Sequence, residues 1–228
     1  MNVEEQYADE QHLLRRRAVW RPGPDGRDPQ QVALKALLAD APDTVVEIGC
    51  GTGAFAARVR DAAPGLDYLA TDASARMVEL AAATGVRAEV AQAGALPLPD
   101  DAVDAAAALW MLYHVPDLDA ALADLRRVIR PGGRLVAVTN GDGHTATLRT
   151  AAGGTPLVTG FSSENGEAAL RRHFAEVVRV DLATRAVFPD RAAALAYLRS
   201  TGEDVDWRLA PFDGELEVAG HVTVFTAG

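Results

Sequence analysis

The sequence predicts an α/β fold in which helices cover both faces of a doubly wound, mainly parallel sheet. Two observations support this fold class. Between residues 30 and 140, short apolar runs alternate with helical periodicities, and the links between them are short. A glycine-rich turn at residues 45–55, VVEIGCGTGAF, follows the first of these apolar runs and opens a helix. With 228 residues, the chain is long enough for one substantial core.

The elements of the first two thirds can be placed by pattern. They are, in order, a helix over residues 4–20, the turn cluster RPGPDGRDP, a helix over 30–38, the strand TVVEIG, a helix over 54–62, the strand LDYLATD, a helix over 74–83, the strands VRAEVAQ and DAAAALWML, a helix over 118–129 that ends at the turn RPGG, and the strand GRLVAVTN.

Beyond Asn140 the periodicity weakens. Residues 141–166 are rich in Gly, Ser and Thr, and are interpreted as a flexible lid or an inserted helical piece. We expect a helix over 163–174, a strand over 177–187, a helix over 191–200 and a final strand, LEVAGHVTVFTA. No internal repeat is present, so one domain with a variable late region is predicted.

The composition indicates which classes of partner and which cellular compartment to expect. The formal net charge is -10, and an acidic surface repels phosphate backbones and anionic lipids, so neither nucleic acid nor membrane is expected as a partner. The single cysteine, Cys50, cannot form an internal disulfide. The first ten residues lack the apolar core of a signal peptide, and no apolar run approaches the ~20 residues that span a bilayer. A cytoplasmic protein is therefore expected.

The glycine loop is a candidate nucleotide site. Gly49, Gly51 and Gly53 alternate, and with Ala54 they satisfy the loose dinucleotide fingerprint, although a strand-to-helix turn without a ligand gives the same pattern. Asp72 ends the second strand about 20 residues on, where a carboxylate can accept hydrogen bonds from ribose hydroxyls. The alternative is a helix N-cap, a role that Ser74 can fill alone. A dinucleotide and an adenosyl ligand both fit.

Glu47 favours the adenosyl ligand over the dinucleotide. It lies two residues before the first glycine, in an otherwise apolar strand. A carboxylate there would repel a pyrophosphate, whereas it suits the ammonium group of a ligand that carries an amino acid.

Four segments together are more specific than the glycine pattern. In order, VVEIGCGTGAF, YLATDASARMVELA, GALPLPDDAVDAAAALWMLYHVPD and LRRVIRPGGRLVAVTN resemble the class I S-adenosylmethionine-dependent methyltransferases, in particular the small-molecule, type 11-like branch. The resemblance covers about residues 41–140 and extends more faintly through FSSENGEAALRRHF and AAALAYLRS. It implies a seven-stranded sheet of order 3-2-1-4-5-7-6 with a reversed final strand. It also implies an N-terminal helical lid (1–40), a cofactor-binding core (41–140) and a remainder with an acceptor-binding insert (141–228).

The resemblance also implies the cofactor, S-adenosylmethionine, with S-adenosylhomocysteine as its product. The residues it places at the cofactor are Tyr7, Glu47, Gly49, Cys50, Gly51, Gly53, Asp72, Ala73, Met77, Gln92, Ala93, Leu109, Trp110 and His114. Two of these depart from the family pattern. Gln92 replaces an acidic residue that would accept from the adenine amino group, and Trp110 stands where the branch often carries His.

The catalytic group is the least constrained. Methyl transfer is an in-line displacement in which holding the reactants together supplies much of the help. His114, just after the fourth strand, is the first candidate base, followed by Tyr113 and by His144 after the fifth strand. Packing or a cofactor contact is the alternative role for each. His12, His173 and His221 are interpreted as surface or packing residues, and no metal-ligand spacing is present.

Several further residues have two interpretations. Tyr7 and the segment LLRRR either fold over the cofactor, with Arg15, Arg16 or Arg17 meeting its carboxylate, or form a solvated amphipathic helix. The basic pair at 171–172 is interpreted as a solvated helix face. Four aromatic residues either wall the acceptor pocket or belong to the core: Trp20, Phe161, Trp207 and Phe212.

The sequence thus predicts an S-adenosylmethionine-dependent methyltransferase, a monomer or a homodimer, that acts on O, N or C of a small molecule such as a natural-product intermediate. Two alternatives remain open. One is a non-catalytic protein that binds an adenosyl ligand. The other is an NAD(P)-dependent oxidoreductase. It is disfavoured because such an enzyme would need a catalytic Tyr-Lys pair or a similar arrangement near the nicotinamide, and the only lysine, Lys35, precedes the glycine loop.

Overall fold

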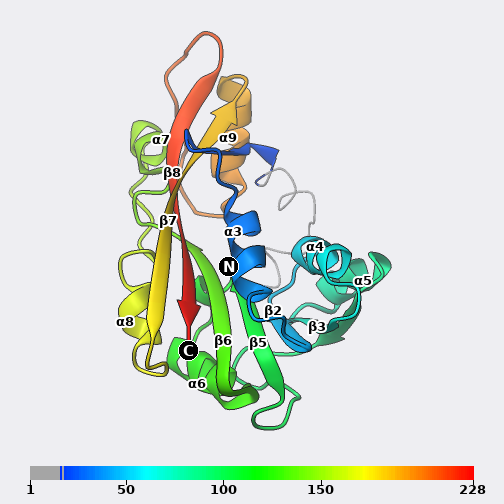
Figure 1. Cartoon of the computed structure of the whole chain (residues 1–228). Coiled ribbons are helices and arrows are strands. Elements are labelled where there is room, and N and C mark those ends of the chain that lie inside the picture. The colour runs from blue at the N-terminus through cyan, green and yellow to red at the C-terminus, as the bar shows by residue number, and fades with distance from the viewer. Residues whose placement is uncertain (1–15, 17) are drawn as a thin grey trace.

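The computed structural model describes residue 16 and residues 18–228 (Figure 1). The elements are β1 (Trp20–Pro22), α3 (Pro29–Leu37), β2 (Thr44–Ile48), α4 (Ala54–Ala62), β3 (Asp67–Asp72), α5 (Ala75–Ala83), β4 (Arg87–Val90), β5 (Val103–Leu109), the 3-10 helix η1 (Leu112–His114), α6 (Leu118–Val128), β6 (Ile129–Asn140), α7 (Ala146–Ala151), α8 (Gly166–Leu170), β7 (Val177–Phe188), α9 (Arg191–Arg199) and β8 (Leu216–Ala227).

These elements form one sheet of order β1-β7-β8-β6-β5-β2-β3-β4 in the described part of the chain. Strands β4, β3, β2, β5 and β6 pair in parallel, whereas β8 pairs antiparallel with both β6 and β7. The predicted α/β class, the strand order and the reversed final strand are confirmed.

The sheet has eight strands in the described residues, where seven were predicted. The additional strand is β1, which pairs antiparallel with residues 184–186 of β7. The helix expected over 4–20 therefore does not reach Trp20, whose ring stacks on His144 with centroids 4.2 Å apart. The rest of that helix, residues 4–15 and 17, lies outside the described residues, whereas the described part of the predicted lid (1–40) contains β1 and α3.

Two further boundaries differ from the sequence prediction. β6 begins at Ile129, before the RPGG turn, and the pairing moves from Val103–Ile129 to Ala105–Arg134 across a bulge. The helix predicted over 163–174 is shorter, Gly166–Leu170, and the segment 141–166 contributes the short helix α7. The strand predicted over 104–112 ends early, at Leu109, and the remaining predicted elements agree with the structure within about two residues.

The core has one apolar layer on each face of the sheet and a third apolar cluster beside the hairpin of β7 and β8. Val46 and Ile48 face the layer that includes α6 and α8, whereas Val45 faces the layer that includes α3 and α4. Strands β7 and β8 continue past the end of β6 at Asn140 and form an arm, with α7 and α9 beside it (Figure 1). The arm has its own apolar cluster, which includes Phe188.

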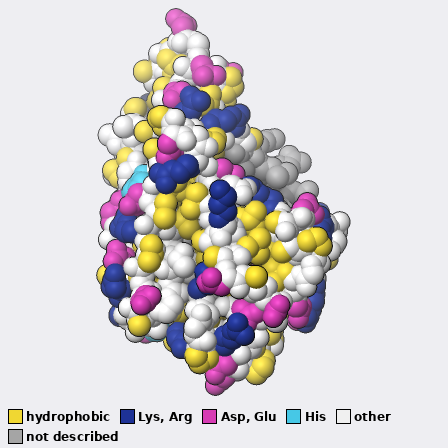
Figure 2. All heavy atoms as spheres, viewed as in Figure 1, with side chains coloured by type: hydrophobic (Ala, Val, Ile, Leu, Met, Phe, Trp, Pro, Cys, Tyr) yellow, Lys and Arg dark blue, Asp and Glu magenta, His cyan; other side chains and the backbone are white. Residues whose placement is uncertain are grey.

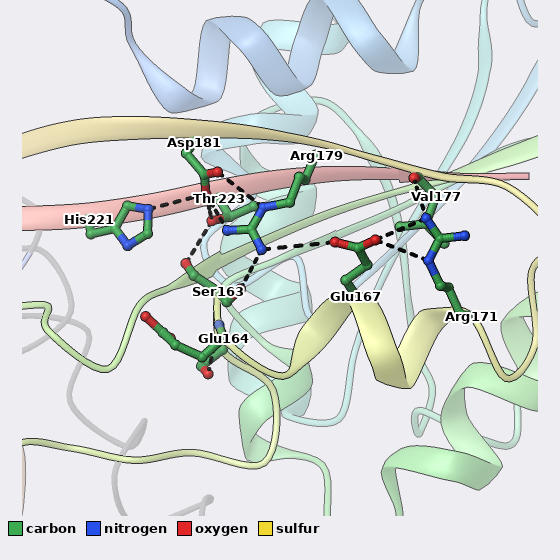
Figure 3. A network of polar contacts seen from close by, with 10 residues as sticks. Ser163, Glu164, Glu167, Arg171, Val177, Arg179, Asp181, His221 and Thr223 are labelled. Carbon is green, nitrogen blue, oxygen red and sulfur yellow. Dashed lines mark hydrogen bonds and ion pairs between the residues drawn. The ribbon is translucent and has the colours of Figure 1, made fainter.

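A polar network joins the segment before α8 to strands β7 and β8, where these strands run beside β6 (Figure 3). Thr223 donates its hydroxyl to Asp181 (2.6 Å), and its oxygen lies 2.7 Å from the Ser163 hydroxyl. Arg179 donates to Asp181 and to the Ser163 carbonyl. These hydrogen bonds, chiefly from Arg179, lower the pKa of Asp181 to about 2. The late region is therefore held firmly against the sheet.

Candidate active site

The glycine loop connects β2 to α4 at the carboxyl edge of the parallel strands. Gly49, Gly51 and Gly53 have φ values of 65°, 55° and 75°, in the left-handed region that favours glycine. A Cβ on Gly49 would lie 2.7 Å from Met111 Cβ, and one on Gly53 would lie 2.7 Å from Ala81 Cα. Gly49 and Gly53 are therefore required by the packing of the protein itself, because a side chain at either position would clash with a neighbouring residue.

Asp72 lies at the end of β3, next to this loop. Its two carboxylate oxygens each accept a backbone N–H, one from Gly51 and one from Ser74, both at 2.9 Å. Ser74 in turn caps α5 by accepting from the Met77 N–H at 3.4 Å, which confirms the cap predicted for it. Because Asp72 is only partly buried and each of its oxygens keeps a lone pair, it can still accept hydroxyl hydrogen bonds.

Glu47 lies beneath the loop and is 2% exposed. The Tyr68 hydroxyl donates to its carboxylate at 2.7 Å. Burial, together with the negative charge of Glu47, raises the pKa of Tyr68, so the phenol keeps its proton and acts as the donor. Tyr68 was not foreseen from the sequence, because its role depends on how β3 aligns with β2.

The other residues of the first two strand ends are placed as follows. Cys50 is buried, and its N–H donates to the Thr71 carbonyl at 2.9 Å. Burial raises the pKa of its thiol well above the ordinary range. Met77 is almost fully buried, whereas Ala73 and Gln92 are exposed and Ala93 is partly buried.

Trp110 breaks the predicted fourth strand. β5 ends at the buried Leu109 because Trp110 has a φ of 54°, and it is the one aromatic residue with a positive φ among the residues described. A bulky side chain in this region is a backbone outlier of the kind that clusters at functional sites. Its indole N–H donates to the Asn140 side-chain oxygen at 3.0 Å, so the ends of β5 and β6 are joined. Asn140 is a second residue that the sequence did not single out.

Tyr113 and His114 follow in η1, with ring centroids 4.4 Å apart. Burial, and to a lesser degree the positive charge of Arg16, lowers the pKa of His114 to about 4. The imidazole is therefore neutral at pH 7, and it is a weak base.

His144 lies in the segment between β6 and α7. It stacks on Trp20, and its Nδ1 lies 3.2 Å from the His221 carbonyl oxygen. Burial lowers its pKa to about 4 as well. The structure therefore gives His144 packing partners.

The remaining predicted residues separate into three groups. Tyr7, His12, Arg15 and Arg17 lie outside the described residues. Phe161 and Trp207 are buried in the core, and Trp20 and Phe212 pack against the arm cluster. His173 contacts Asp119 at 2.9 Å and His221 contacts Asp181 at 3.2 Å, in keeping with packing roles.

Neither of the two cavities described marks the site. One, of about 360 Å³, lies between α7 and β8 on the arm. The other, of about 220 Å³, lies between α4 and the start of β3. No part of the glycine loop lines either cavity.

Among the residues that the structure describes, no group of three or more His, Cys, Asp or Glu side chains is arranged to hold a metal ion. No described helix has both the length and the apolar character needed to cross a bilayer.

The strand ends therefore bring together Glu47, the glycine loop, Asp72, Trp110 and His114 at one edge of a doubly wound sheet. Edges of this kind bind nucleotides where the strand order reverses, here between β2 and β5. The fold and the position of the site are those of a nucleotide-binding α/β domain.

Comparison with known proteins identifies the family. The methyltransferase domain family matches residues 46–137. The demethylmenaquinone methyltransferase of Mycolicibacterium gilvum is 30% identical over 185 residues, which cover 78% of this chain and 76% of that protein. The malonyl-[acyl-carrier protein] O-methyltransferase of Methylococcus capsulatus is 31% identical over 175 residues, covering 72% of this chain and 64% of that protein. The chain belongs to the class I S-adenosylmethionine-dependent methyltransferases, and S-adenosylmethionine is its cofactor.

Two further comparisons are with methyltransferases that are named for other substrates. A 23S rRNA (guanine(748)-N(1))-methyltransferase of Streptomyces fradiae is 38% identical over 124 residues, covering 53% of this chain and 42% of that protein. The structure of geranyl diphosphate methyltransferase with geranyl diphosphate and sinefungin has a TM-score of 0.59 at 19% identity, over 87% of this chain and 77% of that chain, which shows the fold alone. The chain spans about half the length of several curated relatives that it matches.

Proposed function

We propose that this enzyme transfers the methyl group of S-adenosylmethionine to O, N or C of a small molecule, such as a natural-product intermediate, bound beside η1. The observation that carries the proposal is the junction of β5 with the glycine loop. Trp110 and Asn140 join the ends of β5 and β6, and Met111 packs on Gly49. An acceptor beside Tyr113 and His114 would therefore lie next to the loop that holds the cofactor.

The residues present fit the cofactor at each end. Glu47 provides a buried carboxylate for its ammonium group, and Asp72 provides oxygens for its ribose hydroxyls. Ala73 and Gln92 are exposed beyond Asp72, where the adenine would extend. When bound, the cofactor supplies an electrophilic methyl group on a sulfonium sulfur. The chain contributes binding, orientation and the exclusion of water.

A His114 pKa of about 4 makes this residue a poor acceptor for a tightly held proton. An acceptor that is already anionic at the atom that takes the methyl group, for instance a carboxylate or an enolate, would need no such base. The curated relatives include methyltransferases named for demethylmenaquinone and for malonyl-[acyl-carrier protein], whose names are compatible with such an acceptor.

A second candidate is an RNA methyltransferase, because one relative is named for 23S rRNA. The net charge of -10 disfavours it, since phosphate contacts require clustered basic side chains. On the face shown in Figure 2, acidic and basic side chains are interspersed.

The two candidates can be separated by following a labelled methyl group. The purified protein would be incubated with methyl-labelled S-adenosylmethionine and, in separate reactions, with carboxylic acids, hydroxyquinones, amines or ribosomal RNA. Label in a small acid or quinone is the expected result, and Asp72→Ala should reduce it. Label in RNA alone would overturn the proposal. Binding of S-adenosylhomocysteine without transfer to any acceptor would favour a non-catalytic binding protein.

A further inference from the structure

We propose that Tyr68, assisted by Thr71, is a positioning residue for the amino-acid end of the cofactor, and that it acts by fixing the carboxylate of Glu47. This inference rests on the role of Glu47 proposed above. It adds two residues of the neighbouring strand β3 to the recognition of the ammonium group.

The strand register explains how Tyr68 reaches Glu47. In the parallel pair of β2 with β3, Tyr68 lies opposite Val45 and Ala70 lies opposite Glu47. Side chains two residues apart on a strand share a face, so Tyr68 and Glu47 are diagonal neighbours on the same face. The phenol extends toward the carboxyl edge and donates to the carboxylate at 2.7 Å.

Burial makes this hydrogen bond consequential. Glu47 is 2% exposed and Tyr68 is 8% exposed, so water contributes little to solvating either group. A buried carboxylate needs a donor, and a hydrogen bond to a charged group is among the stronger ones. Burial also raises the pKa of Tyr68, so the phenol keeps its proton and remains a donor at neutral pH.

Thr71 holds the backbone of the same residue. Its hydroxyl donates to the Glu47 carbonyl at 2.9 Å, and its own carbonyl accepts from the Cys50 N–H at 2.9 Å. Strand β3 thus fixes both the side chain and the main chain of Glu47. A site that is ordered before binding loses less entropy when the ligand arrives.

The competing explanation is that Tyr68 only fills space. Its ring belongs to the apolar layer with Val59 and lines the 220 Å³ cavity. Phenylalanine would fill the same space without the hydroxyl. A space-filling residue would affect all adenosyl ligands equally, whereas a residue that positions Glu47 would affect only ligands that carry the ammonium group.

The test is a calorimetric titration of wild type and Tyr68→Phe with three probes. S-Adenosylhomocysteine carries the whole amino acid, its decarboxylated analogue keeps only the ammonium group, and 5′-methylthioadenosine has neither. Tyr68→Phe should weaken the first two by about tenfold, as expected for loss of a hydrogen bond to a charged group, and leave the third unchanged. Thr71→Val, which removes the second contact, should give the same pattern with a smaller change. It keeps the test decisive if Tyr68→Phe does not fold.

Two controls separate the failure of this inference from the failure of the proposed function. Tyr197→Phe removes the hydroxyl of a partly buried tyrosine on α9 and should change none of the three affinities. Glu47→Gln should abolish the preference for ligands with an ammonium group. If it does not, the role proposed for Glu47 is wrong. If Glu47→Gln removes the preference while Tyr68→Phe and Thr71→Val change all three ligands alike, or none, only the positioning role is overturned.

Discussion

At the scale of single residues, Asp72 connects two parts of the site. Its carboxylate holds the N–H of Gly51 in the loop before α4 and that of Ser74 before α5. One side chain therefore orders both segments that border the adenosyl site. Its proposed contact with the ribose would add to a carboxylate that is already fixed in place.

Asp72→Ala should weaken S-adenosylhomocysteine binding by about tenfold or more, because hydrogen bonds to a charged group are lost. Isothermal titration at pH 7 would measure the change. Ser74→Ala is the matched control. It removes the cap of α5 and should lower the free energy of unfolding by ~1 kcal/mol with little effect on affinity. Unchanged affinity in Asp72→Ala would show that the ribose assignment is wrong.

The residues that could be predicted are those whose role depends on nearby positions in the chain. Ser74 and Asp72 belong to one turn, so their types and spacing were informative. The roles of Tyr68 and Asn140 could not be predicted from the sequence, because their partners are distant in the chain. Glu47 is 21 positions from Tyr68 and Trp110 is 30 positions from Asn140, and each pair is brought together only by strand pairing. The positive φ of Trp110 could not be predicted either, since an aromatic residue rarely adopts a positive φ.

At the scale of elements, α4 depends on a close approach to α5. Its N-cap is Gly53, which has a φ of 75° and lies where an added Cβ would come 2.7 Å from Ala81 Cα. Two separate requirements, the left-handed backbone and the contact with α5, thus select glycine at this position. The beginning of α4 and the end of the loop are set by the same residue.

Gly53→Ala should therefore destabilise the protein more than Gly26→Ala. Gly26 has a similar φ of 69° but nothing within 4 Å, so it reports the backbone cost alone, ~1–2 kcal/mol. The contact with α5 should add ~1–3 kcal/mol in Gly53→Ala. Urea denaturation of the two variants measures the difference. Equal losses would mean that the packing against Ala81 does not constrain the loop.

Elements with clear periodicity were predicted closely, and α4 and β8 match their expected ranges. The element that was missed, β1, has three residues, too few to show a period, and it exists because β7 offers an unpaired edge. The turn predicted at the RPGG segment was wrong for a different reason. Its proline and glycines signal a turn, but in the sheet they form a bulge inside β6.

At the scale of the whole molecule, two neutral histidines make stability depend on pH. The pKa values of His114 and His144 are lowered to about 4, chiefly by burial, from an ordinary value of 6.5. Between these values the unfolded chain binds protons that the folded chain does not. The free energy of unfolding therefore falls as the pH drops from about 6.5 to about 4. Below that range, the stabilisation from Asp181, whose pKa is about 2, is lost in turn.

The double variant His114→Gln, His144→Gln should flatten this dependence between pH 6.5 and 4.5. Each histidine accounts for at most ~1.4 kcal/mol per pH unit, and for less where solvent reaches the ring. Urea denaturation of wild type and variant across this interval would measure both slopes, with pH 7.5 as the reference where neither histidine contributes. Parallel slopes would contradict the burial argument.

The central claim is that the edge built from Glu47, the glycine loop and Asp72 binds S-adenosylmethionine and excludes nicotinamide dinucleotides. It is tested most directly by a thermal-shift titration of the wild-type chain with S-adenosylhomocysteine, NADH and NADPH. A ligand at 100 times its dissociation constant stabilises the native state by ~2.7 kcal/mol, which is readily detected. A shift with S-adenosylhomocysteine alone is the expected result. A shift with NADH or NADPH instead would contradict it, because a pyrophosphate would then be accommodated beside the Glu47 carboxylate.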